Sequence, residues 1–172
     1  GEVAGGGRSR GIRGDHAKRR RMGGLANGVG EPVIGEIELF ALALRGGPEK
    51  RRPKVSGITG TNGKSTTTAL VGHIRRETGR KTVVGGNIGD AILAQDPPSP
   101  GLHYVLELSS YQIDLTHSLA CDVAVLLNIT PDHIDRHGDF DGYFRAKQRL
   151  FEMQAPSGQA VIGIDDNETA AF

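Results

Sequence analysis

The chain has 172 residues, of which 37% are hydrophobic, and its formal net charge is +1. This is enough for one ordinary domain with a buried core. No run approaches 18 apolar residues and no apolar segment follows the N-terminus, so the sequence predicts neither a transmembrane helix nor a secretory signal. The single cysteine, Cys121, cannot form an internal disulfide, which favours a reducing, cytoplasmic location.

The charge is unevenly distributed along the chain. Residues 1–30 contain 10 of the 26 glycines and carry seven basic and two acidic side chains, whereas residues 31–172 carry 14 basic and 18 acidic ones. The first segment has too few apolar residues to offset the entropy cost of ordering, so we expect a disordered basic arm at 1–30. Its basic run at 18–21 could attract a nucleic acid or an acidic membrane, but no aromatic residue is interleaved for base stacking, which favours a solvated tail.

The rest of the chain alternates between patterns typical of strands and of helices. In chain order the sequence predicts a strand at 33–34, a helix at 36–45, a strand at 54–59, a helix at 64–78, a strand at 81–85, a helix at 90–95, strands at 104–108 and 123–127, a helix at 141–153 and a strand at 160–164. This alternation predicts an α/β fold with a mostly parallel sheet and flanking helices. Because the chain starts with Gly1 and ends within a helix start at 166–172, we expect a fragment.

The motif GTNGKS at 60–65 lies between a predicted strand and a predicted helix. Its glycines let successive N–H groups face one anion, and the helix N-terminus adds partial positive charge. Lys64 is placed to reach nucleotide phosphates, and the Ser65 hydroxyl to bind Mg²⁺. The strict phosphate-loop pattern requires glycine where this chain has Ile58, so the motif is a variant, and the alternative is a glycine-rich turn with a surface lysine. The predicted contacts to the ATP phosphates are Gly60, Thr61, Asn62, Gly63, Lys64, Ser65 and Thr66.

Polar residues follow other predicted strands, at the sheet edge where ligands bind in open α/β folds. Glu107 could hold the Mg²⁺ that bridges ATP phosphates, although a lone carboxylate there is more often a cap or a surface residue. The run GGNIG at 85–89 could let a substrate approach the backbone, or it is a tight turn with Asn87 as a helix N-cap.

The segment NITPDHIDRH at 128–137 follows the predicted strand 123–127. Asp132, His133, Asp135 and His137 could form a metal cluster, although none of their spacings is diagnostic. The alternative is a polar loop in which Asp132 caps a helical turn. We expect one histidine to bind a ligand, with His133 favoured over His137.

Taken together, the motifs resemble the Mur ligase family. They are GTNGKST at 60–66, GGNIG at 85–89, LELSSYQ at 106–112, NITPDHIDRH at 128–137 and YFRAKQRLF at 143–151. The resemblance covers about residues 31–172. It implies a P-loop ATPase-like central domain, incomplete here, at 54–172, preceded by the end of an N-terminal domain and a linker at 31–53.

The resemblance implies ATP-dependent amide bond formation through an acyl phosphate. VIGEIELF at 33–40 and the form LELSSYQ are similar to the family member that adds D-glutamate to UDP-N-acetylmuramoyl-L-alanine in peptidoglycan biosynthesis. This implies ATP and Mg²⁺ as cofactors, small-molecule substrates, a monomer, and neither a nucleic-acid nor a membrane partner. We expect the fragment alone to be inactive. The alternatives are a folylpolyglutamate synthase-like ligase and a nucleotide-binding module with a basic nucleic-acid-binding arm.

The resemblance also implies roles for the phosphate and metal groups. Lys64 would neutralise the β- and γ-phosphates, and Ser65 and Glu107 would hold a first Mg²⁺. His133 would help to hold a second Mg²⁺ and contact the acyl substrate. Lys147 matches a carbamylated lysine that supports the second metal, whereas its own sequence context favours a solvated helix lysine.

Two further positions match the substrate side of the family's cleft. Asn87 and Ser109 correspond to residues that line its muramoyl-peptide end. The catalytic residues implied are Lys64, His133 and Lys147.

Overall fold

The computed structural model of the chain describes residues 33–46, 52–95 and 97–170. The chain divides into two units, Gly1–Val33 and Ile34–Phe172, and the helices and strands described here belong to the second. The arm predicted at 1–30 lies outside the described residues.

The second unit is built on a five-stranded sheet in which every pairing is parallel, in the order β2-β3-β1-β4-β5. The strands are β1 (Lys54–Thr59), β2 (Thr82–Gly86), β3 (His103–Glu107), β4 (Val123–Leu126) and β5 (Gln159–Ile162). Of the three inner strands, β1 and β3 are buried at all positions except Lys54, as parallel strands covered on both faces are. The predicted α/β fold with a parallel sheet is confirmed.

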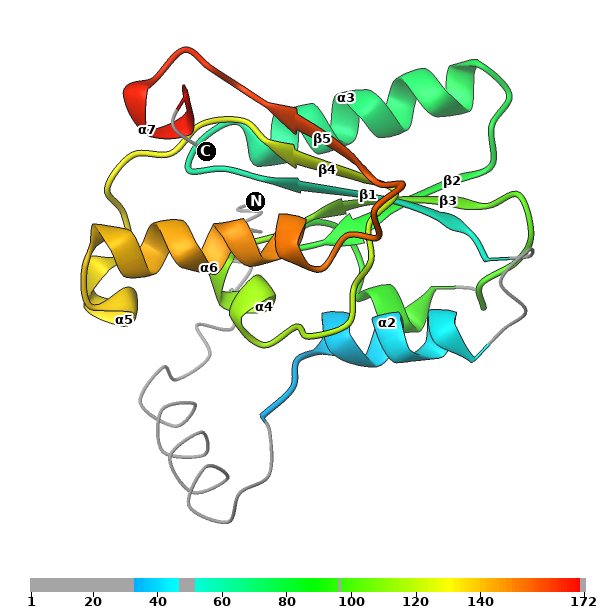
Figure 1. Cartoon of the computed structure of the whole chain (residues 1–172). Helices are drawn as coiled ribbons and strands as arrows, with labels where there is room; N and C mark the ends of the chain where they lie inside the picture. The colour runs from blue at the N-terminus through cyan, green and yellow to red at the C-terminus, as the bar shows by residue number, and fades with distance from the viewer. Residues whose placement is uncertain (1–32, 47–51, 96, 171–172) are drawn as a thin grey trace, which may run out of the picture. The chain divides into compact units, whose positions relative to one another are not determined.

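Helices cover both faces of this sheet. They are α2 (Glu36–Arg45), α3 (Lys64–Glu77), the 3₁₀ turn η2 (Ile92–Ala94), α4 (Ser110–Asp114), α5 (Ile134–His137), α6 (Phe140–Glu152) and α7 (Asn167–Ala170). The helix α3 lies on one face, and α2, α4 and α6 lie on the other (Figure 1). Within the described part of the chain, the helices are too short or too polar to span a bilayer.

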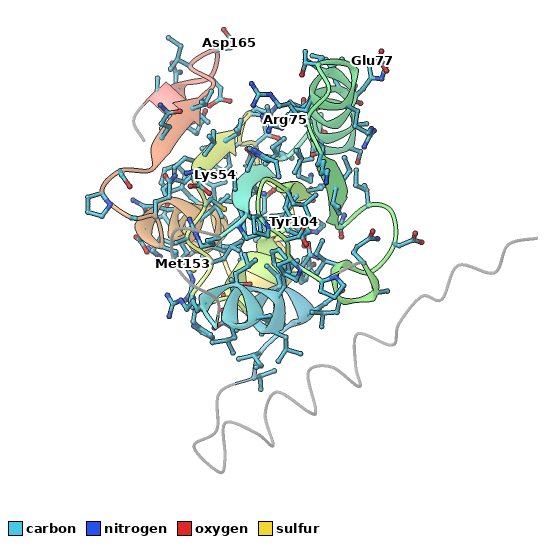
Figure 2. The ribbon with its side chains drawn as sticks, turned by 90° about the vertical axis from the view of Figure 1, so that its right-hand side faces the viewer. Lys54, Arg75, Glu77, Tyr104, Met153 and Asp165 are labelled. Carbon is cyan, nitrogen blue, oxygen red and sulfur yellow. The ribbon has the colours of Figure 1, made fainter. Side chains whose placement is uncertain are left out.

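The main core lies between the sheet and the α2–α4–α6 layer. The Phe40 ring of α2 meets the Tyr104 ring of β3 edge to face, with 4.8 Å between their centroids. Tyr104 lies at the centre of the unit in Figure 2, whereas Glu77, at the end of α3, points to solvent. Apolar burial of this kind is the main favourable contribution to folding.

The buried carboxylate of Glu38 connects α2 to the loop after α4 through hydrogen bonds. Glu38 is 4% exposed. Its Oε2 accepts hydrogen bonds from His117 N (2.7 Å) and Ser118 N (2.9 Å), and its Oε1 accepts one from Ser118 Oγ (2.7 Å). Burial raises the pKa of the Glu38 carboxyl, but these hydrogen bonds lower it by more, so the net pKa is below its ordinary value. The helix α2 therefore packs within the unit Ile34–Phe172, and the assignment of 31–53 to a preceding domain stays a prediction.

Two predicted elements are wrong. No strand forms at 33–34, because the backbone leads directly into α2 and Gly35 N donates to Leu115 O in a loop (3.2 Å). The helix predicted at 90–95 is reduced to the single 3₁₀ turn η2. Gly89, with φ of 72°, precedes this turn and the prolines at 97 and 98 follow it, which leaves no room for a longer helix.

The strand order creates a switch point beside β1. From β1 the chain crosses to β2 on one side of the sheet, whereas from β4 it continues to β5 on the other side. In open parallel sheets, ligands bind in the crevice that such a reversal opens at the carboxyl ends of the strands. The loops that follow β1 and β4 meet at this point.

Candidate functional site

The loop between β1 and α3 has a backbone that requires glycine at two positions. Gly60 has φ of 151° and Gly63 has φ of 78°, and only glycine adopts these conformations without strain. A Cβ at Gly60 would also lie 3.1 Å from Leu127 Cβ and 3.3 Å from Asn128 O. Gly63 is the N-cap of α3 and supplies no side-chain cap. The first turn of α3 therefore presents N–H groups and the positive end of its dipole, which suits an anion.

The segment after β4 holds the first half of this loop. Thr61 N donates to Asn128 O (3.0 Å), and Asn62 N donates to Asn128 Oδ1 (2.9 Å). Asn128 Nδ2 donates in return to Asn62 O (3.2 Å), and Thr130 N donates to Thr61 Oγ1 (3.0 Å). The ammonium of Lys64 donates to Thr61 O (2.8 Å). The loop is thus held in shape by the protein itself.

Lys147 of α6 is buried beside the same loop. It is 1% exposed, and its Nζ donates to Gly60 O (2.9 Å) and lies 3.4 Å from Thr59 Oγ1. The ammonium also lies over the Tyr143 ring, 4.7 Å from its centroid. Burial, together with the nearby Lys64 charge, lowers the pKa of Lys147 to about 7. The expectation of a solvated lysine is wrong: α6 buries Tyr143, Ala146, Lys147 and Leu150, a helical stripe that was readable in the sequence.

Glu107 ends β3 with one carboxylate oxygen unpaired. The residue is 2% exposed, and its Oε1 accepts a hydrogen bond from Asn87 Nδ2 (2.9 Å). Its Oε2 is buried without a hydrogen-bond partner. Such an oxygen is costly unless something satisfies it, and carboxylate oxygen is a preferred Mg²⁺ ligand. Glu107 therefore fits a metal ion. Asn87 is not a helix N-cap, since its side chain is bonded to Glu107.

His133 and His137 lie in an aromatic cluster between α4 and α6. His133 is the one non-glycine residue with positive φ (51°) in the described part of the chain, and its Nδ1 is 3.3 Å from Tyr111 Oη. His137 Nε2 is 3.0 Å from Ser110 Oγ, and burial lowers the His137 pKa. The Tyr143 ring lies 6.1 Å from the His133 ring and 5.5 Å from the His137 ring.

The metal cluster that the sequence left open for this segment does not form. Among the described residues, no three His, Cys, Asp or Glu side chains are grouped to hold one ion. Asp132, His133, Asp135 and His137 therefore do not make a joint ligand set, because His137 is directed to Ser110 while His133 is shared between Tyr111 and Asp132. A role for His133 beside ligands from elsewhere stays a prediction.

The sequence pattern of the Mur ligase middle domain matches residues 58–172. The chain belongs to the Mur ligase family. It is 55% identical over 151 residues to a UDP-N-acetylmuramoylalanine–D-glutamate ligase of Caulobacter sp. strain K31, covering 88% of this chain and 32% of that relative. It is 60% identical over 150 residues to the protein of the same name from Zymomonas mobilis, covering 86% and 34%. The chain thus spans about a third of the length of these relatives.

Solved Mur ligase structures share the fold. The MurF ligase of Thermotoga maritima in complex with ADP superimposes with a TM-score of 0.60 at 20% identity, over 79% of this chain and 33% of that one. A UDP-N-acetylmuramate:L-alanyl-gamma-D-glutamyl-meso-diaminopimelate ligase from Neisseria meningitides also gives 0.60, at 19% identity, over 94% and 52%.

In this Mur ligase domain, most predicted site residues come to the carboxyl edge of the sheet. Hydrogen bonds link Glu107 with Asn87 and join Lys147 to Gly60. Ser109 instead forms a capping box with Gln112 at the start of α4. Sequence reasoning missed Asn128, Thr130 and Tyr143 as contacts of the phosphate loop, although the polar NIT run directly after a buried strand was a usable signal.

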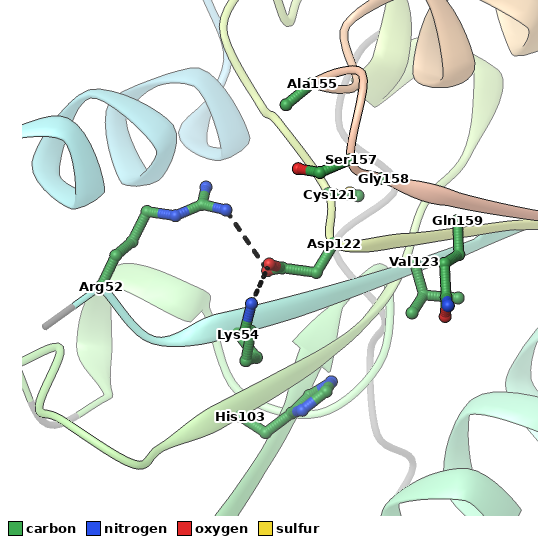
Figure 3. A pocket seen from close by; sticks show the side chains of 10 residues that line it. All are labelled: Arg52, Lys54, His103, Cys121, Asp122, Val123, Ala155, Ser157, Gly158 and Gln159. Carbon is green, nitrogen blue, oxygen red and sulfur yellow. Dashed lines mark hydrogen bonds and ion pairs between the residues drawn. The ribbon is translucent and has the colours of Figure 1, made fainter. Parts of the chain in front are cut away.

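A cavity of about 380 Å³ lies at the opposite, amino edge of the sheet (Figure 3). Its cations are already paired: Lys54 Nζ is 2.7 Å and Arg52 Nη2 is 3.3 Å from the Asp122 carboxylate. Val55 N also donates to Asp122 (2.8 Å). Burial raises the Asp122 pKa, but these partners lower it by more. The arrangement joins the starts of β1 and β4 and leaves neither cation unpaired for an anionic ligand.

Proposed function

We propose that these residues form the nucleotide-binding domain of an ATP-dependent ligase that adds D-glutamate to UDP-N-acetylmuramoyl-L-alanine in peptidoglycan biosynthesis. One observation carries the proposal. At one sheet edge the structure combines a phosphate loop, whose following helix α3 has no side-chain cap, with the unpaired carboxylate oxygen of buried Glu107 and with buried Lys147. Relatives that are 55% and 60% identical bear the name of this ligase. Because the chain spans about a third of them, we assign the whole reaction to the longer protein and expect these 172 residues alone to bind nucleotide without ligating.

In the proposed reaction, the carboxylate of the muramoyl substrate attacks the γ-phosphate of ATP, which gives an acyl phosphate and ADP. The amine of D-glutamate then attacks the acyl carbon, and phosphate leaves. The loop residues 60–66 would hold the phosphates, and Lys64 would neutralise their charge. Such a site acts mainly through positioning and charge stabilisation.

Two metal positions belong to the proposal. Ser65 and Glu107 would hold the first Mg²⁺, which is supported by the unpaired Glu107 Oε2. Bound Mg²⁺ supplies charge neutralisation for phosphoryl transfer. His133 would help to hold the second ion together with carbamylated Lys147, and a Lys147 pKa of about 7 leaves much of the amine neutral, the form that reacts with carbon dioxide.

The substrate contacts, the cellular location and the oligomeric state are proposed from the same resemblance. Asn87 and Ser109 would line the muramoyl-peptide end of the cleft, and His133 would contact the acyl substrate. The net charge of −4 over residues 31–172 supports small-molecule substrates without a nucleic-acid partner. We propose a cytoplasmic location, since ATP and UDP-linked precursors are cytoplasmic compounds, and a monomer, as the resemblance implies.

The metal role of Glu107 gives the test. We expect wild type to bind ADP about tenfold more tightly in Mg²⁺ than in EDTA, as measured by titration calorimetry. Glu107→Gln keeps the size of the side chain but removes its charge, and we expect it to lose this difference while keeping the affinity measured in EDTA. Glu77→Gln, at an exposed carboxylate with 71% of its side chain accessible, is the matched control. A wild-type Mg²⁺ effect in Glu107→Gln would contradict the assignment.

A further inference from the structure

We propose that Asn128 is a positioning residue that fixes the first half of the phosphate loop and thereby directs nucleotide phosphates to the backbone of residues 63–66. This inference rests on the proposed nucleotide binding. It concerns a residue outside the motif GTNGKS, on the segment that follows β4 at the switch point of the sheet.

The side-chain amide of Asn128 matches the peptide groups of Asn62. Its Oδ1 accepts from Asn62 N (2.9 Å) and its Nδ2 donates to Asn62 O (3.2 Å). A side-chain amide is the group that offers one acceptor and one donor in the same plane for this purpose. A carboxylate would face Asn62 O with no donor, and an alanine would leave both backbone groups without these bonds.

The neighbouring residue, Thr61, is held as well. Thr61 N donates to the backbone oxygen of Asn128 (3.0 Å). Thr61 Oγ1 accepts from Thr130 N (3.0 Å) and lies 3.2 Å from Tyr143 Oη. The N–H groups of Thr61 and Asn62 are therefore both occupied by protein acceptors.

The N–H groups of residues 63–66 follow next along the chain. Gly63 supplies no side-chain cap to α3, and Thr67 N is the donor to Gly63 O (3.0 Å). The first-turn N–H groups of residues 64–66 precede this bond and have no acceptor within the helix. A phosphate would thus meet Gly63 and the first turn of α3, while Thr61 and Asn62 set the loop's shape. Holding the loop before the ligand arrives lowers the ordering cost of binding.

The test is amide hydrogen exchange of the 172-residue chain by NMR, first without nucleotide. We expect the Thr61 and Asn62 amides to exchange slowly in wild type. In Asn128→Ala, Asn62 should exchange fast while Thr61, which is bonded to the backbone of Asn128, stays slow and serves as an internal control. Fast exchange of the wild-type Asn62 amide would overturn the proposal.

The second measurement is an ADP titration of the same samples in Mg²⁺. We expect the largest amide shifts at residues 63–66 and an affinity loss of about tenfold in Asn128→Ala. Asn167→Ala, at an exposed asparagine of α7, should bind like wild type. The largest shift at Asn62, or unchanged affinity in Asn128→Ala, would contradict the inference.

Failure of the proposed function and failure of the alanine variant to fold can each be told apart from failure of this inference. A wild-type chain that binds no ADP contradicts the proposed function. The exchange rates of the Asn62 amide in wild type and Asn128→Ala then still test whether Asn128 positions the loop. If Asn128→Ala does not melt cooperatively, Asn128→Asp replaces it. Its carboxylate still accepts from Asn62 N but cannot donate to Asn62 O, so we expect a slow Asn62 amide with weakened ADP binding, and unweakened binding would count against the proposal.

Discussion

At the scale of single residues, Lys147 is the clearest case of an environment that changes a group's chemistry. An ordinary lysine is charged and solvated at neutral pH. Here the ammonium is buried between the phosphate loop and the Tyr143 ring, with Gly60 O as its hydrogen-bond acceptor. Its pKa of about 7 follows from burial and from the nearby charge of Lys64.

This pKa predicts a pH dependence of stability. Between about pH 7 and the ordinary lysine value of 10.5, the unfolded chain binds a proton that folded Lys147 does not, so the free energy of unfolding rises with pH in this window. Below pH 7 both states are protonated and the contribution is constant.

The variant Lys147→Met should lack that rise. Thermal melts between about pH 6 and pH 10 would show a flatter profile than wild type, because the titrating group is gone. Lys81→Met removes an exposed lysine and should keep the wild-type profile. Parallel profiles of Lys147→Met and of wild type with unmodified Lys147 would contradict the lowered pKa.

The sequence predicted part of the site at this scale. A glycine-rich loop between strand and helix was readable from local pattern, and Glu107 from its place at a strand end. The contacts of Asn128 were not, since they join segments whose sequence positions are 66 residues apart and depend on strand order. The unpaired oxygen of Glu107 likewise depends on three-dimensional burial.

At the scale of elements, Glu38 links α2 to the rest of the unit. Three donors from His117 and Ser118 converge on its carboxylate. We expect Glu38→Gln to lower the free energy of unfolding by about 2 kcal/mol at pH 7, because a neutral amide oxygen is a weaker acceptor than a carboxylate for the two backbone N–H donors, and the amide nitrogen cannot accept from Ser118 Oγ. Urea denaturation measures this, and Glu152→Gln, at an exposed position of α6, should change little.

The same carboxylate adds a signed pH effect. The folded pKa of Glu38 lies below the ordinary value of 4.5, so its contribution to stability is present above that value and is lost as the pH falls through the folded pKa. The difference between wild type and Glu38→Gln should therefore shrink in acid. A difference that grows as the pH falls would contradict the ionised state.

Long elements were predicted well and short ones poorly. The helix 36–45 and the strand 54–59 have the predicted bounds, and α3 ends one residue early. The helix α4 has five residues and was missed; its one sequence signal was the Ser109–Gln112 capping box. The strand expected at 33–34 failed because two apolar residues do not specify a pairing partner.

At the scale of the whole unit, the two edges of the sheet differ in chemistry. At the amino edge, Asp122 forms ion pairs with Arg52 and Lys54 and joins β1 to β4. At the carboxyl edge, α3 begins without a side-chain cap, and Glu107 at the end of β3 keeps one carboxylate oxygen without a hydrogen-bond partner. Ligands in open parallel sheets generally bind at the carboxyl ends of the strands, so this difference between the edges is expected. The Mur ligase family match over 58–172 includes the carboxyl edge.

The most direct test of the central claim, that this edge binds nucleotide, is a thermal melt of the chain with and without Mg·ATP. At a ligand concentration about 100 times the dissociation constant, binding should add about 2.7 kcal/mol to the free energy of unfolding. We predict a raised melting temperature in wild type and in Lys81→Ala, and no rise in Lys64→Ala. A cooperative wild-type melt that Mg·ATP does not shift would contradict the account.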